Sequence, residues 1–308
     1  MDERISIRLK RLLSDAKWTQ EQLARRLDVS QKTLNLWISE KSAPRAKNIE
    51  AINSLYQDIV GRAEVDAALL AAAEKKALAK RITVKEIITN EELLDKLTLH
   101  LTYHTNTIEG STMTLAEVKE VLDDDNKVLA NKTAKEQIEA RNHRTALYYL
   151  LDELNAQGKK FKWSKDLILD THLRLMNTLI SNAGMFRRHG VRIMGSRTSL
   201  ANYLSVPQKI DEFIEAINRP VRNLIERLAR THAVFEQIHP FSDGNGRTGR
   251  LILFIQALQH SVAPPLVVKE RKRAYYKYLE IAHLQDKYEL LRLFMAESII
   301  LADNLIKI

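Results

Sequence analysis

The chain contains no cysteine. A disulfide scaffold, a thiolate zinc site, an iron–sulfur cluster and a cysteine nucleophile are therefore excluded. Glycine (9) and proline (6) are scarce among the 308 residues. Because sandwiches and barrels need many tight turns, this scarcity favours a helical protein and excludes collagen-like or low-complexity classes.

Long hydrophobic runs are also missing. The longest, such as Leu251 to Ile255, are too short to span a bilayer, and no apolar run follows the Met-Asp-Glu-Arg start. We therefore expect a cytoplasmic protein that does not bind membranes. With 45% hydrophobic and 28% charged residues, the composition is typical of a globular chain.

Charge and length suggest partners and organisation. Forty-eight Lys and Arg residues outnumber 39 Asp and Glu residues, giving a net charge of +9. This excess suits an anionic partner, such as nucleic acid, a nucleotide or an acidic protein, but does not choose among them. Because domains usually contain about 100–200 residues, we expect two modules.

Hydrophobic periodicity predicts helices along most of the chain. Helical patterns cover residues 4–17, 48–60, 91–108, 164–179, 222–238, 247–260 and 271–283, and the alanine-rich residues 62–80 indicate a connecting helix. Capping boxes at Thr19–Gln22, Thr114–Glu117 and Thr133–Glu136 begin further helices. Only Val191 to Met194 alternates like a strand, which predicts a hairpin extending to about Leu204.

Residues 4–60 have the layout of a helix-turn-helix. They resemble the phage-repressor type through Thr19–Ala24, Leu27–Ser30, Thr33-Leu34 with Trp37, and Pro44. The second helix of the pair would span Ser30 to Ser39, with Gln31, Lys32 and Asn35 facing outward to read base edges. Gln20, Ser30 and Arg45 are candidates for phosphate contacts.

A protein-docking role for residues 1–60 stays open beside DNA binding. The segment holds eleven basic and eight acidic residues, a smaller excess than many DNA readers carry, and the same fold also docks proteins. If it binds DNA, we expect a homodimer, because one small module makes too few contacts for tight specific binding.

The strongest chemical pattern runs from His239 to Arg250, His-Pro-Phe-Ser-Asp-Gly-Asn-Gly-Arg-Thr-Gly-Arg. The turn Gly244-Asn245-Gly246 stands before an apolar-periodic helix. Glycines let main-chain amides converge, and the helix N-terminus adds positive potential, so the turn suits phosphate. Arg247 and Arg250 share one helix face and can both donate to phosphate oxygens.

Two further side chains add chemistry to this turn. Asp243 beside a phosphate site is a natural ligand for Mg²⁺, which usually binds one or two carboxylates plus phosphate. His239 titrates near neutrality and can take a proton from a hydroxyl. The pattern thus predicts a divalent metal, a polyphosphate and a base.

This run matches every fixed position of H-x-F-x-D-G-N-G-R-x-x-R and so resembles the Fic family of AMP-transferring enzymes. The resemblance implies transfer of AMP from ATP to a Ser, Thr or Tyr hydroxyl of a target protein, with release of pyrophosphate. In that scheme His239 is the general base, and Asp243 binds Mg²⁺ (or Mn²⁺). Gly244, Asn245 and Gly246 form the anion hole, Arg247 and Arg250 hold the outer phosphates, and Phe241 anchors the loop in the core.

The resemblance extends over roughly residues 85–300. Gly184, Phe186 and Arg187 resemble the family's approach to a β-hairpin flap, whose strand would contain Val191, Arg192, Ile193 and Met194 and would dock the target by main-chain pairing. A buried core hairpin is the alternative. Tyr276 and Leu279 resemble the adenine-pocket helix, although both could be helix core, and His283 stands where related sequences often have Asn.

The segment Thr105 to Gly110 matches the family's inhibitory pattern [S/T]-x-x-x-E-[G/N]. The resemblance implies that Glu109 pairs with Arg250, so that ATP binds with its α-phosphate misaligned; a misplacement of about an ångström costs about a hundredfold in rate. Related enzymes with this motif can also remove AMP.

These patterns predict an all-α protein. We expect a helix-turn-helix domain at 1–60, a connecting segment at 61–84, and a helical Fic domain at 85–308 that contains an inhibitory helix at 91–110 and one small β-hairpin flap. The expected function is a self-inhibited AMP transferase acting on a target or on itself. The alternatives are a transcription regulator that uses the Fic domain as a nucleotide sensor, and transfer of another phosphate-containing group.

Overall fold

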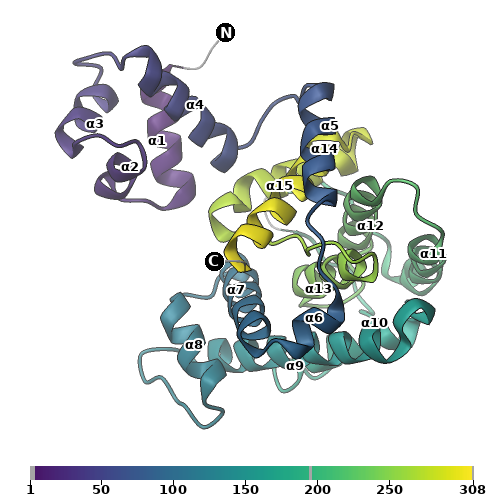
Figure 1. Ribbon diagram of the computed structural model, residues 1–308. Coiled ribbons are helices and arrows are strands. Elements are labelled where there is room, and N and C mark those ends of the chain that lie inside the picture. Colours follow the sequence, from purple (N-terminus) through teal and green to yellow (C-terminus); the bar gives the residue numbers. More distant parts are fainter. Residues whose placement is uncertain (1–3, 194–195, 307–308) are drawn as a thin grey trace. The chain divides into compact units, whose positions relative to one another are not determined.

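The computed structural model describes residues 4–193 and 196–306, and regular structure in them is almost entirely helical (Figure 1). The α-helices are α1 (Ile5–Ala16), α2 (Gln20–Arg26), α3 (Gln31–Ile38), α4 (Ala46–Ile59), α5 (Ala67–Leu78), α6 (Val84–Thr89), α7 (Glu91–Glu109), α8 (Leu115–Asp123), α9 (Ala134–Gln157), α10 (Lys165–Met176), α11 (Val206–Asn218), α12 (Leu224–Ile238), α13 (Asn245–Gln259), α14 (Lys272–Gln285) and α15 (Glu289–Ile306). Short 3₁₀ turns occur at Gly158–Lys160, Tyr203–Ser205 and Lys269–Arg271. The all-α prediction is confirmed.

The chain divides into two compact units, one formed by Met1–Val65 with Glu270–Tyr278 and the other by Asp66–Lys269 with Leu279–Ile308. In the first unit, α1 to α4 enclose an apolar core that includes Leu9, Leu23, Leu34, Trp37 and Ile52. These side chains recur at helical spacing, so each short helix presents one apolar stripe to the common centre.

Side-chain caps define the helix-turn-helix pair, α2 and α3. Thr19 and Gln22 form a capping box that starts α2, and Ser30 accepts a hydrogen bond from the Thr33 main-chain N–H to start α3. Asp28 takes a left-handed conformation (φ 54°) between them, which turns the chain sharply. The expected layout of two short helices around a tight turn is confirmed.

In the second unit, α13 is the central helix. Every side chain from Arg247 to Leu258 is buried, and α7, α9, α10 and α12 pack around it (Figure 1). A helix that is buried all round gives the loop at its N-terminal end a rigid support. That loop is the motif between α12 and α13.

Two elements of the second unit differ from the sequence-based expectation or add to it. The connecting segment contains α5, which packs on the apolar helix α15 and is tied to it by an ion pair from Arg292 to Glu74 at 2.8 Å. The sequence analysis did not identify α15 as a separate helix.

No helix within the described ranges combines the length and hydropathy that crossing a bilayer requires.

The expected hairpin strand is not formed in residues 191–193 or 196–202, and Met194 and Gly195 lie outside the described residues. Main-chain groups of this segment bond locally instead: Ser196 N–H donates to the Ile193 carbonyl at 3.2 Å, and Arg197 N–H donates to Glu280 at 3.0 Å. A strand needs a partner strand for its main-chain groups. Turns and side chains satisfy several of those groups here, so the alternating pattern forms no ladder.

Candidate active site

His239 ends α12 in a left-handed conformation (φ 50°, ψ 61°) that turns its side chain out of the helix. Its Nδ1 lies 3.1 Å from the Glu236 carbonyl oxygen. Because a carbonyl only accepts hydrogen bonds, Nδ1 carries the proton and Nε2 carries a lone pair. The helix end thus prepares the imidazole to accept a proton at Nε2.

The environment of His239 keeps the imidazole neutral. Burial lowers its pKa below the usual 6.5, and Arg187 lowers it further, while the Glu236 carbonyl, Glu109 and Asp243 oppose the shift. A lowered pKa favours the neutral form at pH 7. The predicted base is therefore in the protonation state that this role requires.

Arg187 holds the main chain around His239. Its guanidinium donates to the carbonyls of His239 at 2.7 Å and Ala201 at 2.6 Å, and its main-chain N–H donates to Pro240 at 2.9 Å. The sequence analysis placed Arg187 only in the approach to the flap. Its buried guanidinium instead joins that segment to the catalytic loop.

His172 on α10 is a second support of the loop, and the sequence analysis missed it. Its ring stacks on Phe241 with centroids 3.6 Å apart, which confirms Phe241 as a buried anchor. Nδ1 accepts from Gly184 N–H at 2.9 Å, and Nε2 lies 3.0 Å from the Asp243 carbonyl. Burial lowers the pKa of His172 to about 4. The only sequence signal was a histidine within an apolar helical pattern.

The glycine turn begins α13 at Gly244 (φ 78°). The Asn245 side chain accepts from Phe241 N–H and donates to the Phe241 carbonyl, both at 2.8 Å. It therefore closes the loop between Phe241 and the start of α13. A Cβ would lie 2.6 Å from Met176 Sδ at Gly244, where φ is also positive, and 2.5 Å from a Glu109 carboxylate oxygen at Gly246, so a side chain at either position would displace the end of a neighbouring one.

Glu109, in the last turn of α7, reaches the same place. Its Oε1 lies 2.5 Å from Arg250 Nη2, and Arg250 Nε donates to Thr105 Oγ1 at 2.6 Å. The carboxylate also lies against Gly246, at the positive N-terminus of α13. The two residues that the sequence analysis paired, 141 positions apart, are thus in contact where an anion is expected.

Arg247 is held between two carboxylates. Nη1 lies 2.9 Å from Glu139 Oε1 on α9, and Nη2 lies 3.5 Å from Asp243 Oδ1. Asp243 Oδ1 also accepts from Gly244 N–H at 2.6 Å. The sequence analysis identified Arg247 and Asp243 but not Glu139.

Asp243 is the predicted metal ligand of the loop. Within the described ranges, no three His, Asp or Glu side chains are grouped as a metal would require. The Asp243 side chain is 50% exposed and can offer an oxygen to a cation. One carboxylate suits Mg²⁺ that arrives bound to phosphates rather than a resident metal.

Glu236, on α12, is a further buried carboxyl group whose charge interacts with Arg250 and Glu109. Burial raises the pKa of Glu236 to about 7, opposed by Arg250 and assisted by Glu109. Burial likewise lowers the pKa of the neighbouring His232 to about 3, and the two side chains are 4.0 Å apart. Both groups thus lie in an environment that disfavours charge.

The predicted adenine contacts, Tyr276 and Leu279, fall in different compact units. Tyr276 is part of the first compact unit, whereas Leu279 is a buried residue of the second. His283 lies 2.8 Å from the Ala233 carbonyl through Nε2 and 3.3 Å from Thr198 through Nδ1. Its ring is therefore already engaged, and the adenine pocket stays a prediction.

Ser199–Ala201, in the segment predicted to form the flap, line a cavity that we call the hollow. Val191 and Ile193 are half-buried and Arg192 is exposed, and Ala201 N–H donates to the Gln237 carbonyl two residues before His239. The hollow measures 380 Å³ and is lined by Ser199–Ala201 and by residues of α11 and α12, among them Phe213 and Ile238.

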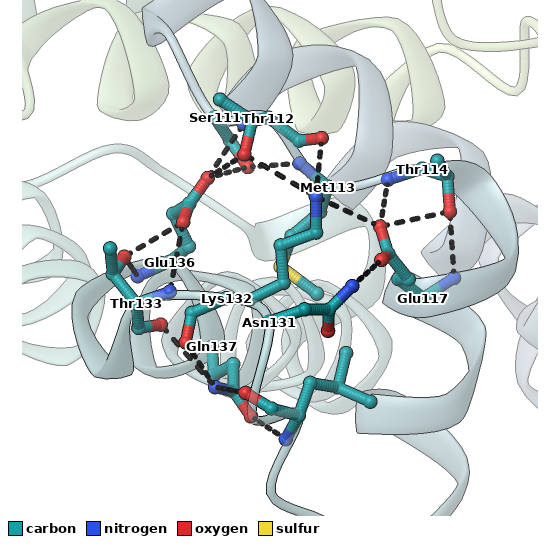
Figure 2. A network of polar contacts seen from close by, with 11 residues as sticks. Ser111, Thr112, Met113, Thr114, Glu117, Asn131, Lys132, Thr133, Glu136 and Gln137 are labelled. Atoms are coloured by element: carbon teal, nitrogen blue, oxygen red, sulfur yellow. Dashed lines mark hydrogen bonds and ion pairs between the residues drawn. The ribbon is translucent and has the colours of Figure 1, made fainter.

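After Gly110 the chain enters a polar network that we call the 111–137 clamp (Figure 2). It is formed by Ser111–Thr114, Glu117, Asn131, Lys132, Thr133, Glu136 and Gln137. Glu136 accepts from Thr112 N–H at 2.6 Å, and Lys132 Nζ donates to the Thr112 carbonyl at 3.0 Å. Although burial acts to raise it, hydrogen bonds from Thr112 and Thr133 lower the pKa of Glu136 to about 2. The clamp fixes the chain immediately beyond α7.

In the first unit, the candidate DNA-reading residues lie on one helix. Gln31, Lys32 and Asn35 are exposed on α3, and Ser30 is its exposed N-cap. Gln20, the first residue of α2, is half-buried, and Arg45 is exposed. This arrangement leaves the outward face of α3 accessible.

Comparison with known proteins bears on both units. Residues 162–257 match the Fic/DOC family model, and residues 7–57 match a helix-turn-helix model. The protein adenylyltransferase Fic of Drosophila willistoni is 26% identical over 256 residues, 82% of this chain and 49% of that protein. The protein adenylyltransferase fic-1 of Caenorhabditis briggsae is 31% identical over 187 residues, 60% of this chain and 36% of that protein. The chain thus spans half the length, or less, of these relatives.

Solved structures share the fold. A Fic domain containing signaling protein from Bacteroides thetaiotaomicron aligns with a TM-score of 0.64 at 20% identity, covering 78% of this chain and 98% of its own. A segment of Fic-1 from Caenorhabditis elegans aligns with a TM-score of 0.66 at 20% identity, covering 97% and 87%. At these identities the likeness concerns the fold alone.

Proposed function

We propose that this chain is a self-inhibited adenylyltransferase that moves AMP from ATP to a protein hydroxyl. It carries a Fic/DOC domain behind a helix-turn-helix domain. One observation carries the proposal: a single loop presents the neutral His239 imidazole beside a glycine-capped helix N-terminus with two buried arginines. Such a loop can bind a triphosphate and activate a hydroxyl.

The reaction follows from these positions. Nε2 of His239 takes the proton of a Ser, Thr or Tyr hydroxyl, and the hydroxyl oxygen forms a bond to the α-phosphorus of ATP. The bond to the β-phosphate oxygen breaks, and pyrophosphate leaves. Arg247 and Arg250 hold the outer phosphates through forked donors. Mg²⁺, entering with ATP, would neutralise phosphate charge at Asp243. We propose that the acceptor segment lies along residues 191–201.

Glu109 would restrain this reaction. Its carboxylate takes a donor of Arg250 and lies at the helix N-terminus that phosphate needs. ATP would then bind with its phosphates displaced, and about an ångström of displacement costs about a hundredfold in rate. Inhibition would thus come from a negative side chain in an anion site.

Glu109→Gly tests this proposal. We expect label from α-labelled ATP to enter the protein itself, or proteins of a cell lysate, about a hundredfold faster than in the unmodified chain. Adding His239→Ala should abolish labelling while ATP binding persists, because the base is lost and the phosphate turn is kept. Thr107→Gly, in the same helical turn, controls for glycine in the helix and should stay silent.

Two results would contradict the proposal: Glu109→Gly as silent as the unmodified chain, or transfer retained after His239→Ala. Mass spectrometry of the labelled product separates AMP from another phosphate-containing group by the added mass.

A second candidate function rests on the helix-turn-helix match at residues 7–57 and on the exposed face of α3. In it, the first unit binds duplex DNA as part of a homodimer, and the Fic domain senses nucleotide. The exposed amides of Gln31 and Asn35 and the ammonium of Lys32 are suited to base edges.

A further inference from the structure

Glu139 is a buried carboxylate that neither the motif nor the proposed reaction uses. It lies on α9, 108 positions before Arg247, and its Oε1 lies 2.9 Å from Arg247 Nη1. The exposed fractions of the two side chains are 11% and 3%. Lys135, largely exposed, lies 3.9 Å from the same oxygen. The contact is thus an ion pair withdrawn from water between α9 and α13.

Arg247 cannot shed its charge, because a guanidinium stays protonated in proteins. Its Nε is buried without a hydrogen-bond partner among the described residues, so the two Nη groups make its polar contacts. One faces the buried Glu139 and the other faces the half-exposed Asp243 at 3.5 Å. Glu139 and Asp243 thus compete for the Arg247 guanidinium.

The competition matters because Asp243 has another proposed task. A carboxylate that pairs closely with arginine is a weaker ligand for a divalent cation, because the positive guanidinium repels that cation. At 3.5 Å the contact with Arg247 is longer than that with Glu139. Glu139 thus provides a closer counter-charge on the side away from Asp243.

We infer that Glu139, on α9, is a positioning residue: it holds Nη1 of Arg247, so that Nη2 can turn from Asp243 to the nucleotide phosphates and Asp243 stays available to the cation that enters with ATP. This inference rests on the proposed function. Without Glu139, Arg247 closes onto Asp243, and the cation and the phosphates each lose a partner.

The experiment uses the full chain with Glu109→Gly, so that transfer can be measured. Glu139→Ala, Glu139→Gln, Arg247→Ala and the double Glu139→Ala/Arg247→Ala are compared by calorimetric titration with ATP at a series of Mg²⁺ concentrations, together with kcat and KM for transfer. Glu153→Ala, on the distal part of α9, is the matched control. Thermal melting identifies variants that fail to fold.

We expect Glu139→Ala to raise the Mg²⁺ concentration for half-maximal ATP binding about tenfold, as is typical of losing a group that orients a ligand. KM for ATP should rise more than kcat falls. Glu139→Gln keeps an oxygen that accepts from Nη1 and should recover most of the loss. In the double variant, the Glu139 change should add nothing to the Arg247 change, because both remove the same interaction.

A merely structural tie between α9 and α13 gives a different result: Glu139→Ala lowers the melting temperature, while the Mg²⁺ concentration for half-maximal ATP binding does not move. That result overturns the inference while leaving the proposed function intact. If Glu109→Gly transfers no label, the proposed function fails, but the Mg²⁺ series on ATP binding still decides the role of Glu139. If the parent binds no ATP, both fail.

Discussion

His239 occupies a left-handed helix end beside a buried arginine, and both features affect its proton. The end of α12 exposes the Glu236 carbonyl, which fixes the proton on Nδ1. Burial, then Arg187, lower the pKa from 6.5. The residue that the motif predicts as a base is thus neutral before any substrate binds, and only its Nε2 is needed for proton transfer.

The pH dependence of transfer tests this protonation state. Because the base must be neutral, the rate of Glu109→Gly should be independent of pH above 6.5 and should fall about tenfold per pH unit below the lowered pKa. The measurement is kcat/KM from pH 5 to 8 at constant ionic strength. If kcat/KM falls with a midpoint at or above pH 6.5, burial does not lower the pKa of His239.

Sequence analysis identified the residues inside the motif and missed those that support it. His239, Asp243, Arg247 and Arg250 follow one another at fixed spacing, and Glu109 has its own local pattern. His172, Arg187 and Glu139 reach the loop from 52 to 108 positions away. Such contacts are made by tertiary packing, which periodicity does not record. Only Arg187 belonged to a local pattern, and that pattern indicated the approach to a flap rather than this contact.

Among the elements, helix starts were predictable and the strand was not. The capping boxes at Thr19, Thr114 and Thr133 form as expected, because each is a local bond between residues three positions apart. The alternation at 191–193 forms no strand, since a strand depends on a partner that the sequence does not identify.

The proposed inhibitory helix is followed by an element outside its own motif. α7 ends at Glu109 with Gly110 as its C-cap, and the 111–137 clamp ties the next residues to the start of α9 (Figure 2). Loosening the clamp should let the last turn of α7, with Glu109, move from Arg250. We therefore predict that residues outside the site influence the position of Glu109.

Lys132→Ala and Glu136→Gln should each raise transfer by the otherwise unmodified chain, by at most about tenfold. The limit follows because a hydrogen bond contributes about 1 kcal/mol and about 1.4 kcal/mol corresponds to a factor of ten. Lys127→Ala, which removes an exposed pair with Glu120, is the control and should change nothing. Initial rates of labelling measure the effect; rates equal to those of the unmodified chain would show that the clamp does not position Glu109.

On the scale of the whole molecule, the chain forms two compact units with chemistry of different kinds. Two modules were expected from length alone, but no periodicity indicates that residues 270–278 cluster with the first unit. One unit presents an exposed helix with amide and ammonium groups, and the other a loop at the start of the buried helix α13. The two proposed functions can therefore be separated by substitutions in one unit at a time.

DNA binding by the first unit is tested with the full chain and duplexes covering the DNA upstream of its own gene. The logarithm of the binding constant should fall linearly with the logarithm of salt concentration, because neutralised phosphates release counterions. Arg45→Ala should reduce the slope of this salt dependence by about one and should weaken binding to all duplexes alike. Gln31→Ala should instead relax the preference for one DNA sequence. Lys159→Ala, an exposed lysine of the second unit, should leave binding unchanged.

Repeating the titration with Mg²⁺ and ATP distinguishes a DNA reader from a nucleotide-sensing regulator. A sensor must bind DNA with different affinity when ATP is bound, since a ligand shifts an equilibrium only through differential affinity for two states. The same factor must then appear in ATP affinity when DNA is added, because coupling between two sites is reciprocal. Equal DNA affinity with and without ATP contradicts the sensor, and the absence of salt-sensitive binding to every duplex contradicts DNA reading altogether.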